Sequence, residues 1–310
     1  MKTRMIFFFV LAGIFFTFSF VQAAALPVKK SGYLDFGYWY KHSYLANGLP
    51  VRTVAVLDFE TLEPLYYHGE LNVMPTASLM KLITAGTFVQ DQTIDWDSLV
   101  GVSWWDNEGD LRKYVGPNDR YVLLRLEENE RIPVRDMFAS MMIASANNAA
   151  NRLATLSGGT LTKFISRMRE TAKKWGLEST QIAEPSGLSL DNLSNAKDMA
   201  LAVCQALRDE RISNVAMLPS YDFEQVLGRP YKIQHTVYEI RNRSSQYFGA
   251  KTGFLYETRF HTAAGLVSPQ GKKLCVALLS GQTRAESEEL LPAIGEWADQ
   301  MYSWAGQSVL

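Results

Sequence analysis

The chain has 310 residues, of which 47% are hydrophobic and 20% are charged, and its formal net charge is -1. This composition is typical of a globular protein with a substantial core and excludes a disordered chain. The near-neutral charge provides no basic field of the kind that binds nucleic acid. The length suits one large domain or two closely packed ones.

The first residues have the pattern of an export signal. Lys2 and Arg4 precede an apolar run, and Val21-Gln22-Ala23 supplies small residues at the two positions that a signal peptidase inspects. The run has about 16 residues, against the roughly 20 that a membrane-spanning helix needs, so an uncleaved anchor is the weaker interpretation. We expect residues 1–23 to be a signal peptide and the mature protein to be secreted, periplasmic or otherwise extracytoplasmic.

The next segment, residues 24–50, is rich in aromatic side chains. We interpret it as an N-terminal strap that packs on the main domain, residues 51–310; a ligand-binding platform is the alternative. Within that domain, the β-rich runs at 53–57 and 65–68 predict an antiparallel hairpin.

A long helical region follows the hairpin. Apolar residues recur at three- and four-residue spacing over 161–172 and predict an amphipathic helix that ends near Gly176. Ser194 or Asn195 can cap another helix that runs to Leu207.

Strand-like segments then return, and a helix is predicted from residue 285 onward; the strands span residues 247–253, 259–267 and 273–279. We therefore predict an α+β fold, in which both chain ends form one antiparallel sheet flanked by helices. A helical subdomain is inserted at roughly residues 86–240.

The two cysteines, Cys204 and Cys275, both stand in apolar sequence contexts. Export would permit a disulfide, but buried free thiols are common in such contexts. We expect both cysteines to be unpaired.

The segment Ser78-Leu79-Met80-Lys81 carries the first chemical signal. A serine and a lysine three residues apart lie on one face of a helix, so the hydroxyl stands beside an amine. A serine needs a base to act as a nucleophile, and a lysine is a base only when burial or nearby cations lower its pKa. Alone, this pattern is also typical of an ordinary helix turn.

Two further polar motifs lie downstream. Ser145 and Asn147 interrupt an apolar helical stretch at residues 137–153, where polar groups must find partners. Lys251-Thr252-Gly253 lies in a predicted strand, where a glycine often marks the close approach of another backbone. Taken alone, the first motif is better explained by a satisfied buried network or a helix-helix turn, and the second by an exposed edge strand.

Together, the S-x-x-K, S-x-N and K-T-G motifs resemble, in order and spacing, those of the penicillin-binding protein and serine β-lactamase superfamily. Residues 75–85 resemble P-A-S-x-x-K-x-x-T-A, residues 183–188 resemble N-P-x-G-L, and residues 194–200 resemble S-T-A-R-D-M-A. The resemblance runs from about Val51 to the chain end and is to low-molecular-mass D-alanyl-D-alanine carboxypeptidases and endopeptidases, of the peptidase S11 type. It implies a β-lactamase/transpeptidase-like fold.

The resemblance also implies residue roles in cleavage of a D-Ala-D-Ala or D-Ala cross-link bond of peptidoglycan. Ser78 would attack the carbonyl, Lys81 would take its proton, and Ser145 would relay the proton toward the leaving group. Asn147 would hold the substrate amide. The terminal carboxylate would be bound by Lys251 and by the residue that follows it, Thr252.

An oxyanion hole would consist of the backbone N–H groups of Ser78 and of Phe254, which follows Gly253. Arg284 is a further candidate for the substrate carboxylate. The expected partners are peptidoglycan stem peptides, with β-lactams as covalent inhibitors. We expect no cofactor and no metal, since the four histidines lack ligand spacing.

The chain departs from the family pattern at three places: Ala146 stands in place of the usual Gly, Glu184 in place of the Asn of N-P-x-G-L, and three extra residues follow the K-T-G motif. One alternative is a class A-like β-lactamase with Glu184 as deacylating base, but Leu188 stands where its Asn partner should be. The other is a non-catalytic penicillin- or peptidoglycan-binding protein, which the intact motifs disfavour. The stretch from Trp104 to Tyr121 matches no family motif.

The last helix has an apolar face, which consists of Leu290, Leu291, Ile294, Trp297, Met301 and Trp304. No Lys or Arg follows Arg284, so attraction to anionic lipid is missing. We interpret this face as part of the core and expect no strong membrane anchor.

Overall fold

The computed structural model describes residues 49–103, 106, 111–116 and 121–307. The predicted signal peptide, nearly all of the predicted strap, and Trp104 and Trp105 lie outside the described residues. Among the described residues, no helix is both long and apolar enough to cross a membrane.

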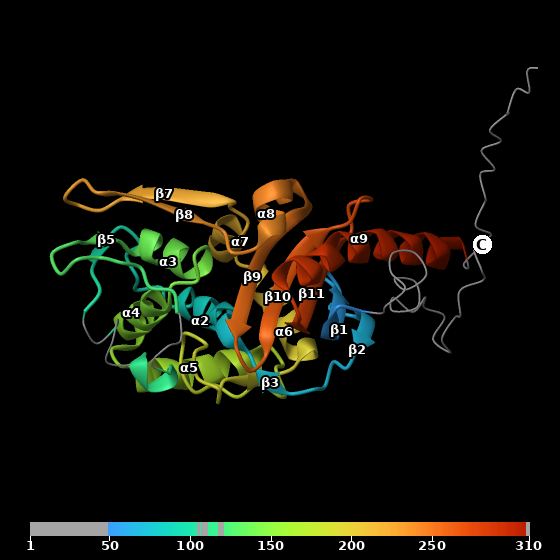
Figure 1. The fold of residues 1–310 in the computed structure, drawn as a ribbon, viewed down its shortest axis with the longest axis horizontal. Helices are drawn as coiled ribbons and strands as arrows, with labels where there is room; N and C mark the ends of the chain where they lie inside the picture. Colours follow the sequence, from blue (N-terminus) through green and yellow to red (C-terminus); the bar gives the residue numbers. More distant parts are fainter. Residues whose placement is uncertain (1–48, 104–105, 107–110, 117–120, 308–310) are drawn as a thin grey trace, which may run out of the picture.

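A five-stranded antiparallel sheet forms the centre of the structure, and its strands come from the N-terminal part of the described chain and from the part that precedes the last helix (Figure 1). Its order is β2-β1-β11-β10-β9, with β1 at Val51–Asp58, β2 at Pro64–His68, β9 at Tyr247–Leu255, β10 at Arg259–Val267 and β11 at Lys273–Gly281. In register, Ala277 of β11 lies opposite both Ala55 and Ala263. The predicted α+β class, with a sheet made by both chain ends, is confirmed.

Helices cover both faces of this sheet. The long C-terminal helix α9, Arg284–Gln307, packs its buried Trp297 and Leu290 against one face. Helix α6, Ala196–Leu207, packs against the opposite face, and α2, Met80–Phe88, packs on α6. The apolar face predicted for the last helix has six side chains, of which five are described. All five are buried in the core, as predicted.

A disulfide joins α6 to the sheet, because Cys204 and Cys275 are bonded with their Cα atoms 5.5 Å apart. The expectation of two free thiols is therefore wrong. Cys204 lies on the buried face of α6 and Cys275 on the face of β11 that packs against it, so the two sulfurs meet in one core cluster. Burial alone does not distinguish a thiol from a disulfide.

The chain between β2 and β9 is mostly helical, as expected, with short two-stranded ribbons. Its helices are η1 (Ala77–Leu79), α2, η3 (Arg112–Tyr114), α3 (Val134–Met142), α4 (Asn147–Gly158), α5 (Leu161–Lys174), α6, α7 (Glu210–Ala216), α8 (Tyr238–Arg243) and η4 (Ser244–Gln246). Its strands are β3 (Met74–Pro75), β4 (Leu99–Val100), β5 (Ile132–Pro133), β6 (Leu193–Ser194), β7 (Ser220–Glu224) and β8 (Pro230–Gln234). The predicted limits of an inserted subdomain stay a prediction.

Capping residues explain where two predicted helices begin. The Thr160 side chain accepts a hydrogen bond from Lys163 N at the start of α5, and Asn195 accepts one from Asp198 N at the start of α6. Gly176, with φ +74°, follows the end of α5 in the left-handed conformation that favours glycine.

Candidate active site

Ser78 lies in the short helix η1, directly before α2, and is partly exposed. Two glycines let other segments approach its backbone. A Cβ at Gly187 would collide with the Ala77 carbonyl, and a Cβ at Gly253 would lie 3.2 Å from Ser78 N. The Ser78 turn is therefore enclosed between the 183–192 loop and the edge strand β9.

Lys81 extends from α2 and has no exposed surface. Its Nζ donates to Ser78 Oγ at 2.9 Å, to Asn147 Oδ1 at 2.7 Å and to the Ser186 carbonyl at 2.5 Å. Burial lowers the pKa of Lys81 to about 7, while the negative charge of Glu184 acts in the opposite direction. A large neutral fraction of this amine therefore exists near neutral pH, as a base beside Ser78 requires.

Ser145 occupies the break between α3 and α4. Its φ of +64° is rare for a serine and turns the chain sharply between the two helices. Asn147 begins α4, where its backbone N–H and its Nδ2 both donate to the Val122 carbonyl, at 2.8 and 3.1 Å. Its amide keeps one N–H and one lone pair free to bind a substrate peptide group.

Lys251 is the second fully buried lysine. Its Nζ donates to Ser145 Oγ at 2.8 Å and to the Thr252 carbonyl at 3.1 Å. Burial, with smaller contributions from the positive charges of Lys81 and Arg284, lowers the pKa of Lys251 well below its ordinary value. Each of the two serines thus has its own buried amine.

The remaining predicted residues lie along β9 and at the start of α9. Thr252 is almost fully buried beside Lys251, and Phe254 is 37% exposed. The Phe254 ring contacts the ring of Phe260, with centroids 4.6 Å apart. The Arg284 guanidinium lies 5.8 Å from the Phe260 ring centroid, and its positive charge contributes to the lowered pKa of Lys251. Hydrogen bonds thus link Ser78 to Lys81 and Asn147, and Ser145 to Lys251, while Thr252, Gly253 and Phe254 follow Lys251 on the same strand. The roles of the nine residues stay a prediction.

The sequence motifs did not predict the structural role of Glu184. Its side chain is buried and accepts hydrogen bonds from Ser186 N at 2.5 Å, Gly187 N at 2.6 Å and Asn192 Nδ2 at 2.6 Å. Its signal in the sequence was the replacement of the Asn of N-P-x-G-L.

His261 was missed as well. Its Nδ1 accepts from Ser280 N at 2.9 Å, so its Nε2 carries the proton and donates to the Pro75 carbonyl, 3.1 Å away. It lies opposite Gly253 in the β9–β10 register and links β10 to the segment that precedes Ser78. Burial lowers the pKa of His261 to about 4, so the ring is neutral at pH 7. No sequence spacing indicates this contact.

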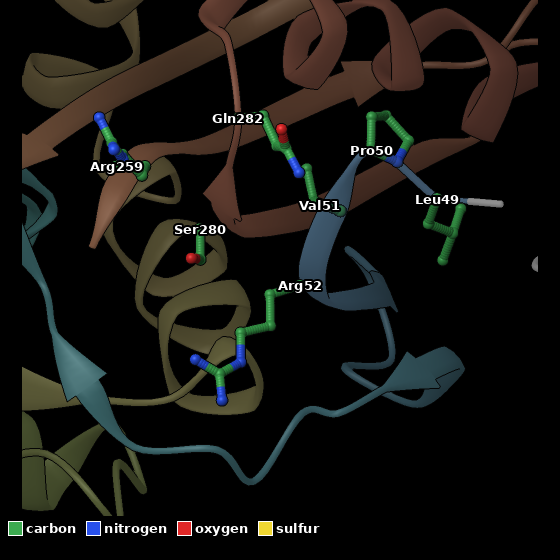
Figure 2. Close-up of a pocket in the computed structure, with 7 residues that line it drawn as sticks. All are labelled: Leu49, Pro50, Val51, Arg52, Arg259, Ser280 and Gln282. Atoms are coloured by element: carbon green, nitrogen blue, oxygen red, sulfur yellow. The ribbon is translucent and has the colours of Figure 1, made fainter. Parts of the chain in front are cut away.

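A separate cavity of about 650 Å³ lies at the ends of β1, β10 and β11 (Figure 2). Its lining contains none of the predicted site residues and consists of Leu49, Pro50, Val51, Arg52, Arg259, Ser280 and Gln282. Within the described part of the chain, no group of three or more His, Cys, Asp and Glu side chains is placed to hold a metal ion.

Comparison with known proteins identifies the family of the chain. The family model of the peptidase S11 D-alanyl-D-alanine carboxypeptidases matches residues 48–271. A D-alanyl-D-alanine endopeptidase of Haemophilus influenzae is 25% identical over 210 residues, 68% of each chain. One of Pseudomonas aeruginosa is 27% identical over 221 residues, 68% of this chain and 67% of the relative.

Solved structures match the fold. The crystal structure of the Streptomyces K15 DD-transpeptidase superposes with a TM-score of 0.70 at 18% identity, over 83% of this chain and 97% of that one. An evolved penicillin-binding protein homologue from Mycobacterium tuberculosis gives a TM-score of 0.67 at 20% identity, over 84% and 92%. The family match covers most of the chain, and the chain therefore belongs to the peptidase S11 family and is a serine DD-peptidase.

Proposed function

We propose that the protein cleaves D-Ala-D-Ala or D-Ala cross-link bonds of peptidoglycan stem peptides through an acyl-enzyme on Ser78. The observation that carries this proposal is the contact of the buried Lys81 Nζ with Ser78 Oγ at 2.9 Å. A base in hydrogen-bond contact with a hydroxyl nucleophile is the arrangement that acyl transfer needs.

The proposed reaction has two halves. In acylation, Ser78 Oγ attacks the D-Ala carbonyl carbon and its proton passes to neutral Lys81. The resulting oxyanion accepts hydrogen bonds from the backbone N–H groups of Ser78 and Phe254, which contribute several kcal/mol in the transition state. The C–N bond then breaks, and the leaving amine takes the proton through Ser145. In deacylation, water attacks the ester, and Ser78 regains its proton.

The carboxylate of the leaving D-Ala is assigned to Lys251 and Thr252, with Arg284 as a third contributor. An isolated buried lysine is costly to protonate, as the lowered pKa of Lys251 indicates. A bound carboxylate reverses this, since an opposite charge favours the ammonium form. Lys251 is therefore expected to bind a carboxylate together with a proton.

The β-lactamase alternative requires a carboxylate that activates the deacylating water. The Glu184 carboxylate is 3% exposed, and its two oxygens accept four hydrogen bonds from its own loop. A carboxylate with its lone pairs used in this way is poorly placed to activate water. The geometry therefore supports a peptidase with slow release of penicillin.

An extracytoplasmic location is part of the proposal, together with stem peptides as substrates and β-lactams as covalent inhibitors. The Cys204–Cys275 disulfide supports this location, because such bonds persist in oxidising compartments. Cleavage of the signal peptide after Ala23 is tested by sequencing the mature N-terminus.

The family is named for carboxypeptidases, whereas the two relatives above are named endopeptidases. Purified pentapeptide monomers and cross-linked dimers test both reactions. Mass spectrometry should detect loss of D-Ala or of the cross-link with the wild type, and neither product with Ser78→Ala. Failure of the wild type to release any product from either muropeptide would overturn the proposal.

A further inference from the structure

One buried carboxylate organises the loop of residues 183–192. Glu184 Oε2 accepts from Ser186 N, while Oε1 accepts from Gly187 N, from Ser189 N at 3.2 Å and from Asn192 Nδ2. Asn192 Oδ1 in turn accepts from Glu184 N at 3.2 Å. Charge-assisted bonds of this kind are stronger than neutral ones, so the carboxylate determines the shape of the loop.

The loop contacts the catalytic segment at several points. The Ser186 carbonyl accepts from Lys81 Nζ at 2.5 Å. The Asn192 carbonyl accepts from Thr76 N at 2.8 Å, and Gly187 lies directly against the Ala77 carbonyl. A change in the loop would therefore move an acceptor of the base and the backbone beside the nucleophile.

We propose that Glu184 is a positioning residue for Lys81, which it controls in two ways. Through the loop, it places the Ser186 carbonyl that accepts a hydrogen bond from Lys81 Nζ. Through its negative charge, it favours the ammonium form of a lysine that burial disfavours. The Glu184 carboxylate bonds to Ser186, Gly187, Ser189 and Asn192 of its own loop, and this inference rests on the proposed function of Lys81 as base.

This inference depends on the departure from N-P-x-G-L, in which a charged Glu stands at the position of a neutral Asn. An Asn at position 184 could accept hydrogen bonds from the loop, but it would carry no charge. The charge of Glu184 on the loop acts on Lys81, whereas the charges of Lys81 and of Arg284 on α9 act on Lys251 of β9. Glu184 is the one anion among these groups. Its removal would lower the pKa of Lys81 further below its present value of about 7.

The sign of the effect can be worked out for acylation. Acylation needs neutral Lys81, so its rate constant falls at acid pH as the lysine becomes protonated. Loss of the Glu184 charge makes neutral Lys81 available at lower pH. The acid limb of the pH profile, where the acylation rate constant falls, therefore shifts to lower pH. We expect a shift of about one pH unit, the lower end of what one nearby opposite charge produces.

The experiment measures the second-order rate constant of acylation by a fluorescent penicillin from pH 5 to 9. Glu184→Gln removes the charge and keeps the length. Glu184→Asn and Glu184→Asp form a pair of equal length that differs only in charge, and Asn is the residue of the family motif. Asp191→Asn is the control, because it removes an exposed carboxylate from the same loop.

In Glu184→Gln and Glu184→Asn, the acylation rate constant should begin to fall at a lower pH than in the wild type. In Glu184→Asp and Asp191→Asn, it should fall at the same pH as in the wild type. Should Glu184→Gln fail to fold, the Asn and Asp pair still decides the question. Equal limbs for Asn and Asp, or an upward shift, would overturn the electrostatic role. Failure of the wild type to be acylated at any pH would instead refute the proposed function.

Discussion

Lys251 Nζ on β9 donates to Ser145 Oγ on the α3–α4 turn at 2.8 Å, across 106 positions of sequence. This contact joins the edge of the sheet to the helical region. It gives Ser145 a buried amine of its own, separate from the lysine that serves Ser78. The leaving-group side of the proposed site is built from this pair.

Replacement of Lys251 tests carboxylate binding. In Lys251→Ala, the KM of peptides with a free C-terminal carboxylate should rise about tenfold or more, because a charge-assisted hydrogen bond is lost. The KM of matched peptides with a C-terminal amide should change much less. Equal losses on both peptide series would instead assign Lys251 to proton transfer.

The disulfide should contribute to stability without contributing to catalysis. The Cys204–Cys275 bond closes a sequence separation of 71 residues, and such a bond typically contributes about 2–4 kcal/mol to the free energy of unfolding. Denaturant unfolding of Cys204→Ala/Cys275→Ala should show this loss, while the acylation rate constant at 25 °C stays close to that of the wild type. If both cysteines of the native protein react with an alkylating agent under denaturing, non-reducing conditions, the disulfide is absent.

The buried neutral His261 should make the fold sensitive to acid. Its folded pKa, about 4, lies below the ordinary value of 6.5, so the unfolded state binds the proton first as pH falls. The stability is complete above about pH 6.5 and is lost progressively between pH 6.5 and 4. By pH 5 the loss from this one group is about 2 kcal/mol.

Unfolding of wild type and His261→Asn at pH 7 and pH 5 measures this contribution. The variant should be less stable at pH 7 and should lose less stability on acidification. His235, whose pKa burial lowers to about 3, titrates in both proteins and cancels in the comparison. An unchanged pH slope in the variant would contradict the assignment.

Release of penicillin distinguishes the peptidase from a β-lactamase. A general base contributes roughly 10²- to 10⁴-fold to a rate, so a β-lactamase that used Glu184 would lose turnover on its replacement. We expect a penicilloyl-enzyme that persists for minutes or longer, with a lifetime within about twofold of the wild type in Glu184→Gln at a pH above both acid limbs. Timed release of labelled penicillin measures this, and rapid turnover that collapses in the variant would establish the β-lactamase.

The strands and the residues of the candidate site could be predicted because their signals are local. The β-rich runs, the helix caps and the three motifs each lie within a few residues, and the joint spacing of the motifs predicted the candidate site. The break at Ser145 was less visible, because apolar residues continue from 137 to 153 across the turn. The disulfide and the Glu184 loop depend on side chains that meet only in the folded chain, so no local pattern reveals them.

The site of covalent attachment tests the central claim most directly. The protein should be incubated with a labelled penicillin, digested, and the adduct mapped by mass spectrometry, with Ser78→Ala as the matched variant and circular dichroism to confirm its fold. The account predicts one adduct, on Ser78, and none in the folded variant. An adduct on another residue, or labelling that persists in Ser78→Ala, would contradict it.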